Sequence, residues 1–125
     1  MSEIELEKEI QAKGLTAPRV TPAEIEASIG SEFYFTAADG CAGASGRRPN
    51  SVCSGTALKL LTFCILVLEN GFTVTGESAC ASPENFDAEL GRKIARANAV
   101  NKIWPLMGYA LKQKLHDLSQ QTEAT

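Results

Sequence analysis

The densest group of side chains that could do chemistry is a basic segment near the C-terminus. Residues 92–114 carry six basic side chains and no acidic one. Arg92 and Arg96 are spaced one helical turn apart, and guanidinium groups can hold a phosphate or a carboxylate through paired hydrogen bonds. The pattern indicates an anion-binding surface, and the alternative is an ordinary solvated basic face.

Polar and aromatic side chains nearby could complete such a surface. Hydroxyl groups lie in the stretch 73–78, Asn98 borders the basic face, and aromatic rings beside arginines can stack on a base. The alternative for the aromatic residues is a place in the core or at a subunit interface. We therefore expect the ligand-binding residues to be Arg92, Arg96, Asn98, Lys102, Thr75, Ser78, Trp104 and Tyr109.

The inventory of catalytic groups is thin. His116 is the single histidine and lies close to a polar tail, and the glycines at 40–55 precede no G-K-[ST] sequence. The four cysteines, Cys41, Cys53, Cys64 and Cys80, form no C-x-x-C pair of the kind that zinc sites use. We expect no catalytic residue, no metal site and no cofactor, and the protein is not expected to be an enzyme.

Composition sets the broad class. The chain has 125 residues, of which 44% are hydrophobic and 22% charged, with a net charge of −3. These values fit one small folded domain and give no overall basic excess for nucleic-acid binding. The acidic N-terminus lacks the pattern of a signal peptide. Reduced thiols in a cytosolic protein are the default prediction, and a disulfide framework is the lesser alternative.

Three helical segments and one short strand should position these residues. Thr21-Pro22 with Glu24 is a helix start that predicts a helix over 22–37, in which 33–35 could instead be extended. The apolar run predicts a buried helix over 57–69 that is too short to span a bilayer. Residues 72–76 alternate as a short strand does. The Ser82-Pro83 pair predicts a long helix over 83–118, broken at Trp104-Pro105.

These elements predict an α+β fold that is mainly helical, with three to four helices and one short β element in a single compact domain. We expect an acidic flexible arm over 1–20, a globular domain over 21–118 with a Gly/Ser/Arg loop at 41–56, and a polar tail over 119–125. A helix apolar on every side is hard to cover with so few elements, which predicts a homo-oligomer. On the long helix, the predicted apolar side comprises Phe86, Leu90, Ile94, Ala97 and Trp104.

Four blocks of the chain resemble a family of small tailed-phage proteins named after gene products of a coliphage and a temperate Shigella phage. The blocks are 20–25, 34–40, 58–87 and 91–115, so the resemblance covers about residues 20–115. The arm before Val20 and the loop at 41–56 depart from it. The family is of unknown function, so no site residue carries over. The resemblance implies a phage accessory protein that acts in the host cytoplasm.

Phage accessory proteins of this size often act on the host or its defences, which is an analogy of class. We therefore expect a non-enzymatic protein for host takeover or counter-defence that sequesters a small anionic ligand such as a signalling nucleotide. The first alternative is a protein-binding inhibitor of a host factor, such as a defence protein. A nucleic-acid-binding regulator ranks third and rests on the basic segment alone. We expect no membrane partner.

Overall fold

The computed structural model describes residues 2–15, 17–45 and 56–124, and these divide into two compact units. The first unit comprises the described parts of 1–28 and 103–125, and the second comprises those of 29–102. Helix α5, Ala88–Ala124, runs through both units. No helix in the described part of the chain is both long enough and apolar enough to cross a membrane.

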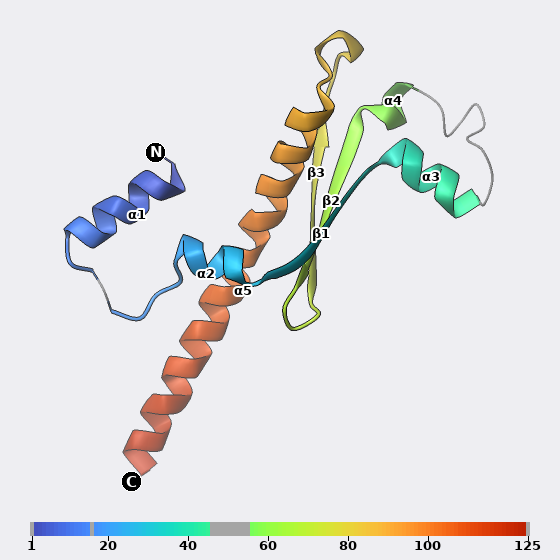
Figure 1. Cartoon of the computed structure of the whole chain (residues 1–125). Coiled ribbons are helices and arrows are strands. Elements are labelled where there is room, and N and C mark those ends of the chain that lie inside the picture. The colour runs from blue at the N-terminus through green and yellow to red at the C-terminus, as the bar shows by residue number, and fades with distance from the viewer. Residues whose placement is uncertain (1, 16, 46–55, 125) are drawn as a thin grey trace. The chain divides into compact units, whose positions relative to one another are not determined.

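The second unit is built on a three-stranded antiparallel sheet in the order β1-β2-β3 (Figure 1). Strand β1 spans Ile29–Thr36, β2 spans Leu61–Leu68 and β3 spans Thr73–Ala79. Two short helices, α3 over Ala37–Ser45 and α4 over Thr56–Lys59, lie between β1 and β2 in the chain. A 3₁₀ turn, Pro83–Asn85, precedes α5.

The two faces of this sheet differ in what covers them. Side chains alternate between the faces along each strand, and the register aligns Tyr34, Cys64 and Gly76 in one row across the sheet. The first part of α5 packs on the face that carries this row, which we call the covered face. The opposite face, called the open face, carries Ser31, Phe33, Phe35, Leu61, Phe63, Ile65, Val67, Thr73, Thr75, Glu77 and Ala79.

Helix α5 meets the covered face through small residues. Ala95 and Ala99 are fully buried, and a Cβ atom added at Gly76 would collide with the backbone of both. The helix backbone therefore lies directly against β3, a distance that only glycine allows at this position. Cys64, Leu66 and Val74 of the sheet and Val100 of the helix complete the buried apolar residues here.

The first unit combines α1, Glu3–Ala12, and α2, Pro22–Ala27, with the C-terminal part of α5. Ser2 and Glu5 form reciprocal hydrogen bonds that cap α1. Thr21 accepts a hydrogen bond from the Glu24 amide, which confirms the helix start predicted at Thr21-Pro22. Glu7 of α1 accepts two hydrogen bonds of 2.7 Å from the Arg19 guanidinium, fastening the segment before α2 to α1. Ile25 and Ile103 are the buried large side chains of this unit.

The predicted fold needs correction at its centre. The fold is α+β, but the prediction of one short β element is wrong, because the sheet has three strands. Residues 61–68 form the central strand and not a buried helix. A short apolar run has no periodicity that separates a buried strand from a buried helix. Its Thr62, Phe63, Ile65 and Val67 favour a strand once neighbours are available for pairing.

Three predicted helix boundaries also change. Helix α2 ends at Ala27, and the chain then becomes β1 instead of helix up to residue 37. The long helix begins at Ala88, where the Asp87 carboxylate accepts a hydrogen bond from the Leu90 amide, and not at Ser82-Pro83. It continues through Pro105, so the predicted break is wrong. A proline inside a helix removes one N–H donor, and the other backbone bonds of α5 persist on both sides.

The structure bears on parts of the predicted arm at 1–20 and of the predicted loop at 41–56. Residues 3–12 of the predicted arm are helical, and its flexibility stays a prediction. Residues 41–45 of the predicted loop belong to α3, and 46–55 lie outside the described residues. Cys41 is disulfide-bonded, whereas Cys64 and Cys80 are free. The default prediction of reduced thiols therefore fails at Cys41.

Candidate functional site

The strongest candidate for a site is a small pocket at Arg92, on the covered side of the second unit. Its volume is about 110 Å³. Arg92 is exposed and forms no ion pair or hydrogen bond with any other described residue, so its five N–H donors stay available. The pocket is lined by aromatic, hydroxyl and charged side chains: Tyr34, Phe35, Thr36, Asp39, Thr62, Phe86 and Arg92, with Ala88.

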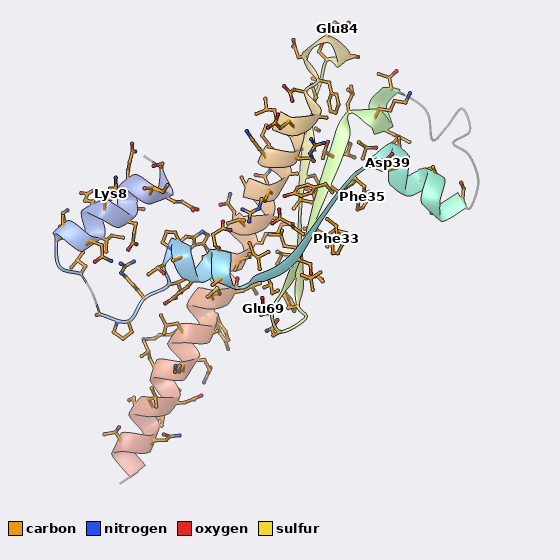
Figure 2. All side chains as sticks on the ribbon, viewed as in Figure 1. Lys8, Phe33, Phe35, Asp39, Glu69 and Glu84 are labelled. Atoms are coloured by element: carbon orange, nitrogen blue, oxygen red, sulfur yellow. The ribbon has the colours of Figure 1, made fainter. Side chains whose placement is uncertain are left out.

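Strand β1 and the start of α3 form one wall of this pocket. The Asp39 carboxylate accepts a hydrogen bond of 3.0 Å from the Thr36 amide, and the Thr36 hydroxyl accepts one of 3.2 Å from the Asp39 amide. This reciprocal pair caps α3 and fixes both side chains beside the pocket. Asp39 and Phe35 are labelled in Figure 2, where they lie close together at the junction of β1 and α3. The wall thus combines a fixed carboxylate acceptor with an aromatic ring.

The other wall comes from β2, the segment before α5 and the first turns of α5. Thr62 is 3% exposed, and a Cβ atom at Gly91 would lie 3.2 Å from its hydroxyl oxygen. Glycine at 91 therefore lets α5 approach the strand at this end of the sheet. Arg92 follows directly and reaches the pocket from the helix. The geometry suits an anionic group held at Arg92 while aromatic and hydroxyl side chains surround it.

Arg96 has a different role from Arg92. Its Nε donates a hydrogen bond of 3.2 Å to the Glu32 carboxylate on β1, and its side chain is 29% exposed. The other oxygen of Glu32 accepts a hydrogen bond of 2.9 Å from the Tyr34 hydroxyl. Arg96 therefore joins α5 to the sheet, and its charge is already opposed by a carboxylate. The predicted pair of arginines is not a matched pair of ligand groups.

Burial perturbs two groups in this network. Burial raises the pKa of the Tyr34 hydroxyl well above its ordinary range, and the hydrogen bond to Glu32 acts in the same direction. Burial also raises the pKa of the Cys64 thiol, which the hydrogen bond with Tyr34 opposes in part. Both groups are neutral at physiological pH. They form a tightly packed polar contact between β1 and β2 and supply neither a base nor a nucleophile.

Three of the predicted ligand-binding residues lie apart from one another: Asn98, Ser78 and Thr75. The Asn98 amide donates a hydrogen bond of 2.8 Å to the Glu77 carbonyl, which ties α5 to the outer edge of β3. Ser78 lines a second pocket of about 140 Å³, whose wall includes Cys80, Leu90 and Ile94. Thr75 lies on the open face, opposite Ile65. The structure does not bring these three together with Arg92.

The remaining predicted residues lie elsewhere. Lys102 is exposed at the end of the α5 segment that belongs to the second unit. Trp104 belongs to the first unit, where its Nε1 donates a hydrogen bond of 3.2 Å to Glu3 on α1. Tyr109 belongs to the same unit and is 72% exposed. The Trp104 indole thus joins α5 to α1 through Glu3, and this contact does not support its predicted stacking on a ligand base.

The apolar side predicted for the long helix is wrong. Leu90 and Ile94 are 54% and 44% exposed, while Ala95 and Ala99 face the sheet. The backbone of α5 lies so close to β3 at Gly76 that only small side chains fit between them. The small side chains of Ala95 and Ala99, and not the larger ones of Leu90 and Ile94, are therefore buried. Of the six bases in 92–114, Arg96 pairs with Glu32 and Lys93 lies 3.6 Å from Glu89. Because carboxylates neutralise two of the six positive charges, the hypothesis that this segment binds nucleic acid is weakened.

Sequence reasoning missed the pocket residues on β1, on β2 and in the segment before α5, which are Tyr34, Phe35, Thr36, Thr62 and Phe86. One signal for them exists in the sequence. Glu32, Tyr34 and Thr36 alternate with Phe33 and Phe35, which is the period of a strand with one polar and one apolar face. Reading that segment as the end of a helix concealed the alternation.

Comparison with known proteins identifies the family. The profile of the phage protein (N4 Gp49/phage Sf6 gene 66) family matches residues 20–115, which is more than half of the chain. No curated protein and no solved structure matches the chain. The match includes every described element of the second unit, with the Arg92 pocket. The chain belongs to the phage protein (N4 Gp49/phage Sf6 gene 66) family.

Proposed function

We propose that this phage protein is a non-enzymatic accessory protein for host takeover or counter-defence that sequesters a small anionic ligand of the signalling-nucleotide class. One observation carries the proposal: Arg92, which has no partner among the described residues, lines a pocket that also presents aromatic rings and hydroxyl groups. A guanidinium group suits a phosphate, and aromatic faces suit a base or the apolar side of a sugar. The protein is expected to act in the host cytoplasm.

The size of the pocket limits what one chain encloses. Binding sites for drug-sized ligands usually have volumes of about 300–1,000 Å³. The pocket of about 110 Å³ can enclose one charged group of a nucleotide, and the rest of the ligand would extend over its rim. Asp39 in the lining of this pocket is an acceptor for ligand hydroxyl or amino groups, which favours a nucleotide over inorganic phosphate, because the sugar and base of a nucleotide supply such donors.

Calorimetric titration with ADP-ribose, a cyclic dinucleotide and inorganic phosphate tests the proposal. We expect one of the two nucleotide probes to bind, and Arg92→Ala to weaken that binding by about tenfold or more, as the loss of a charge-assisted hydrogen bond predicts. Lys93→Ala is the matched control, because it removes the adjacent positive charge from a side chain outside the pocket. Equal affinity of both variants, or no binding of either nucleotide, contradicts the proposal.

A second candidate function, inhibition of a host protein, is favoured by the exposed apolar side chains of α5. Leu90 and Ile94 lie one turn apart beside the second pocket. In an infection assay, Leu90→Lys/Ile94→Lys would abolish activity under this function while nucleotide binding at Arg92 remained unchanged. Loss of activity in Arg92→Ala with full activity in the double variant favours the ligand function instead.

A further inference from the structure

We propose that the open face of the sheet is the contact surface of a homodimer, in which two copies of this chain stack face to face. The central strand motivates this inference. Its Leu61, Phe63, Ile65 and Val67 lie on the open face, while Thr62, Cys64 and Leu66 are buried under α5 on the covered face. A strand that is apolar on both faces is typical of a sheet covered on both sides.

The described segments cover only one end of the open face. A Cβ atom at Gly40 of α3 would lie 3.1 Å from the ring of Phe35, and this ring lies 5.5 Å from that of Phe63. Beyond that end, Phe33 is 55% exposed. Figure 2 shows Phe33 projecting from β1 on the side away from α5. A large aromatic side chain thus stands in solvent next to the apolar row of β2.

Charge favours a second copy as the occupant. Among the positions of the open face, Glu77 alone is charged, and it lies on the edge strand β3. Two identical faces can therefore stack without burying like charges at their centre. An acidic or basic partner, such as a nucleic acid or a charged peptide, would find no complementary charge there. The partner that fits is another neutral apolar sheet.

Shape favours a particular arrangement of the two copies. Outside the end that α3 covers, the open face carries the large side chain of Phe33 on β1 and the smaller side chains of Thr73 and Thr75 on β3. A two-fold axis parallel to the strands places β1 of one copy over β3 of the other. Large side chains then meet small ones in both halves of the contact, as interdigitated sheets require.

The area of the face sets the expected strength of the dimer. Three strands of seven or eight residues present a flat area of at most about 350 Å² per copy, because α3 covers one end of the face. Side chains that project from the sheet increase the accessible area, yet the contact stays at or below the lower end of specific interfaces, about 1,200 Å² in total. We expect a reversible dimer with a dissociation constant in the micromolar range, because interfaces of this size are typical of transient complexes. This inference does not depend on the ligand proposed above.

Analytical ultracentrifugation of the full chain over a range of concentrations tests the dimer. Thr75→Lys places a charge on each open face, and we expect it to raise the dissociation constant by about tenfold or more. Phe33→Thr should act in the same direction by removing the large side chain. Phe72→Thr is the matched control, because Phe72 is also 55% exposed but lies in the turn between β2 and β3, and it should leave the dissociation constant unchanged.

Circular dichroism checks that each variant folds. If Phe33→Thr does not fold, Thr75→Lys still tests the dimer, because Thr75 is exposed on an edge strand and its substitution should not disturb the core. A wild-type chain that stays monomeric up to about 100 µM overturns the inference, because a micromolar dimer would be populated there. A dissociation constant that Thr75→Lys leaves unchanged overturns it as well and locates the contact on another surface.

Discussion

At the scale of single residues, two arginines one helical turn apart have different roles. Arg96 is held by Glu32, whereas Arg92 has no partner among the described residues. A helical wheel places them on the same side and cannot separate them. The difference arises because β1 places a carboxylate opposite one arginine and a pocket opposite the other.

This difference predicts unequal effects of the two substitutions on stability. Arg96→Ala should lower the free energy of unfolding by about 1 kcal/mol, since the ion pair is part-exposed and screened by solvent. Arg92→Ala should change it by less than about 0.5 kcal/mol, as expected for a surface side chain. Urea denaturation measures both values. If Arg96→Ala also proves neutral, the ion pair with Glu32 contributes nothing in solution.

At the scale of elements, the contact between β3 and α5 depends on one glycine. Gly76→Ala should destabilise the chain by about 1–3 kcal/mol or more, because its Cβ atom would collide with helix backbone that cannot rotate away. Gly43→Ala in α3 is the matched control, since nothing lies within 4 Å of an added Cβ atom there. A helical alanine at 43 should stabilise by up to about 1 kcal/mol. Thermal unfolding of the two variants makes the comparison, and equal stability would refute the close helix–strand contact.

The attachment of the segment before α2 to α1 should depend on pH. The Arg19 guanidinium lowers the pKa of Glu7 to about 2 from the ordinary value of 4.5. The contact therefore stabilises this unit fully above about pH 4.5, and its contribution is lost as the pH falls toward 2. Titration of the Glu7 carboxyl by NMR measures this, with amide exchange in α1 as a second reading. Glu7→Gln should abolish the pH dependence of that exchange, and a Glu7 pKa near 4.5 would contradict the ion pair.

At the scale of the whole molecule, the open face makes stability depend on concentration. A folded dimer in equilibrium with unfolded chains becomes more stable as the protein concentration rises. We expect the thermal midpoint of the wild-type chain to rise between about 5 and about 100 µM, and that of Thr75→Lys to rise less over the same range. Differential scanning calorimetry provides both curves. A wild-type midpoint independent of concentration argues against the dimer.

The amino-acid sequence by itself determined the family, the helix start at Thr21-Pro22, the β element that became β3 and the presence of a long basic helix near the C-terminus. Each of these depends on neighbours in the chain: a cap, a turn, an alternation or a continuous block of residues. Arg92 also emerged from the sequence, because a run of bases without acids is visible in the chain itself.

The tertiary structure alone decided the rest. Residues 61–68 became a strand because β1 and β3 were available to pair with them, and the local pattern fits a buried helix equally well. Because the backbone of α5 lies directly against Gly76, only small side chains fit in the contact. Helix α5 therefore buries Ala95 and Ala99 and exposes Leu90 and Ile94. The pocket at Arg92 joins β1, β2 and α5, which are distant in sequence. Its partners could not be predicted from the sequence, because only the pairing of the strands brings them together.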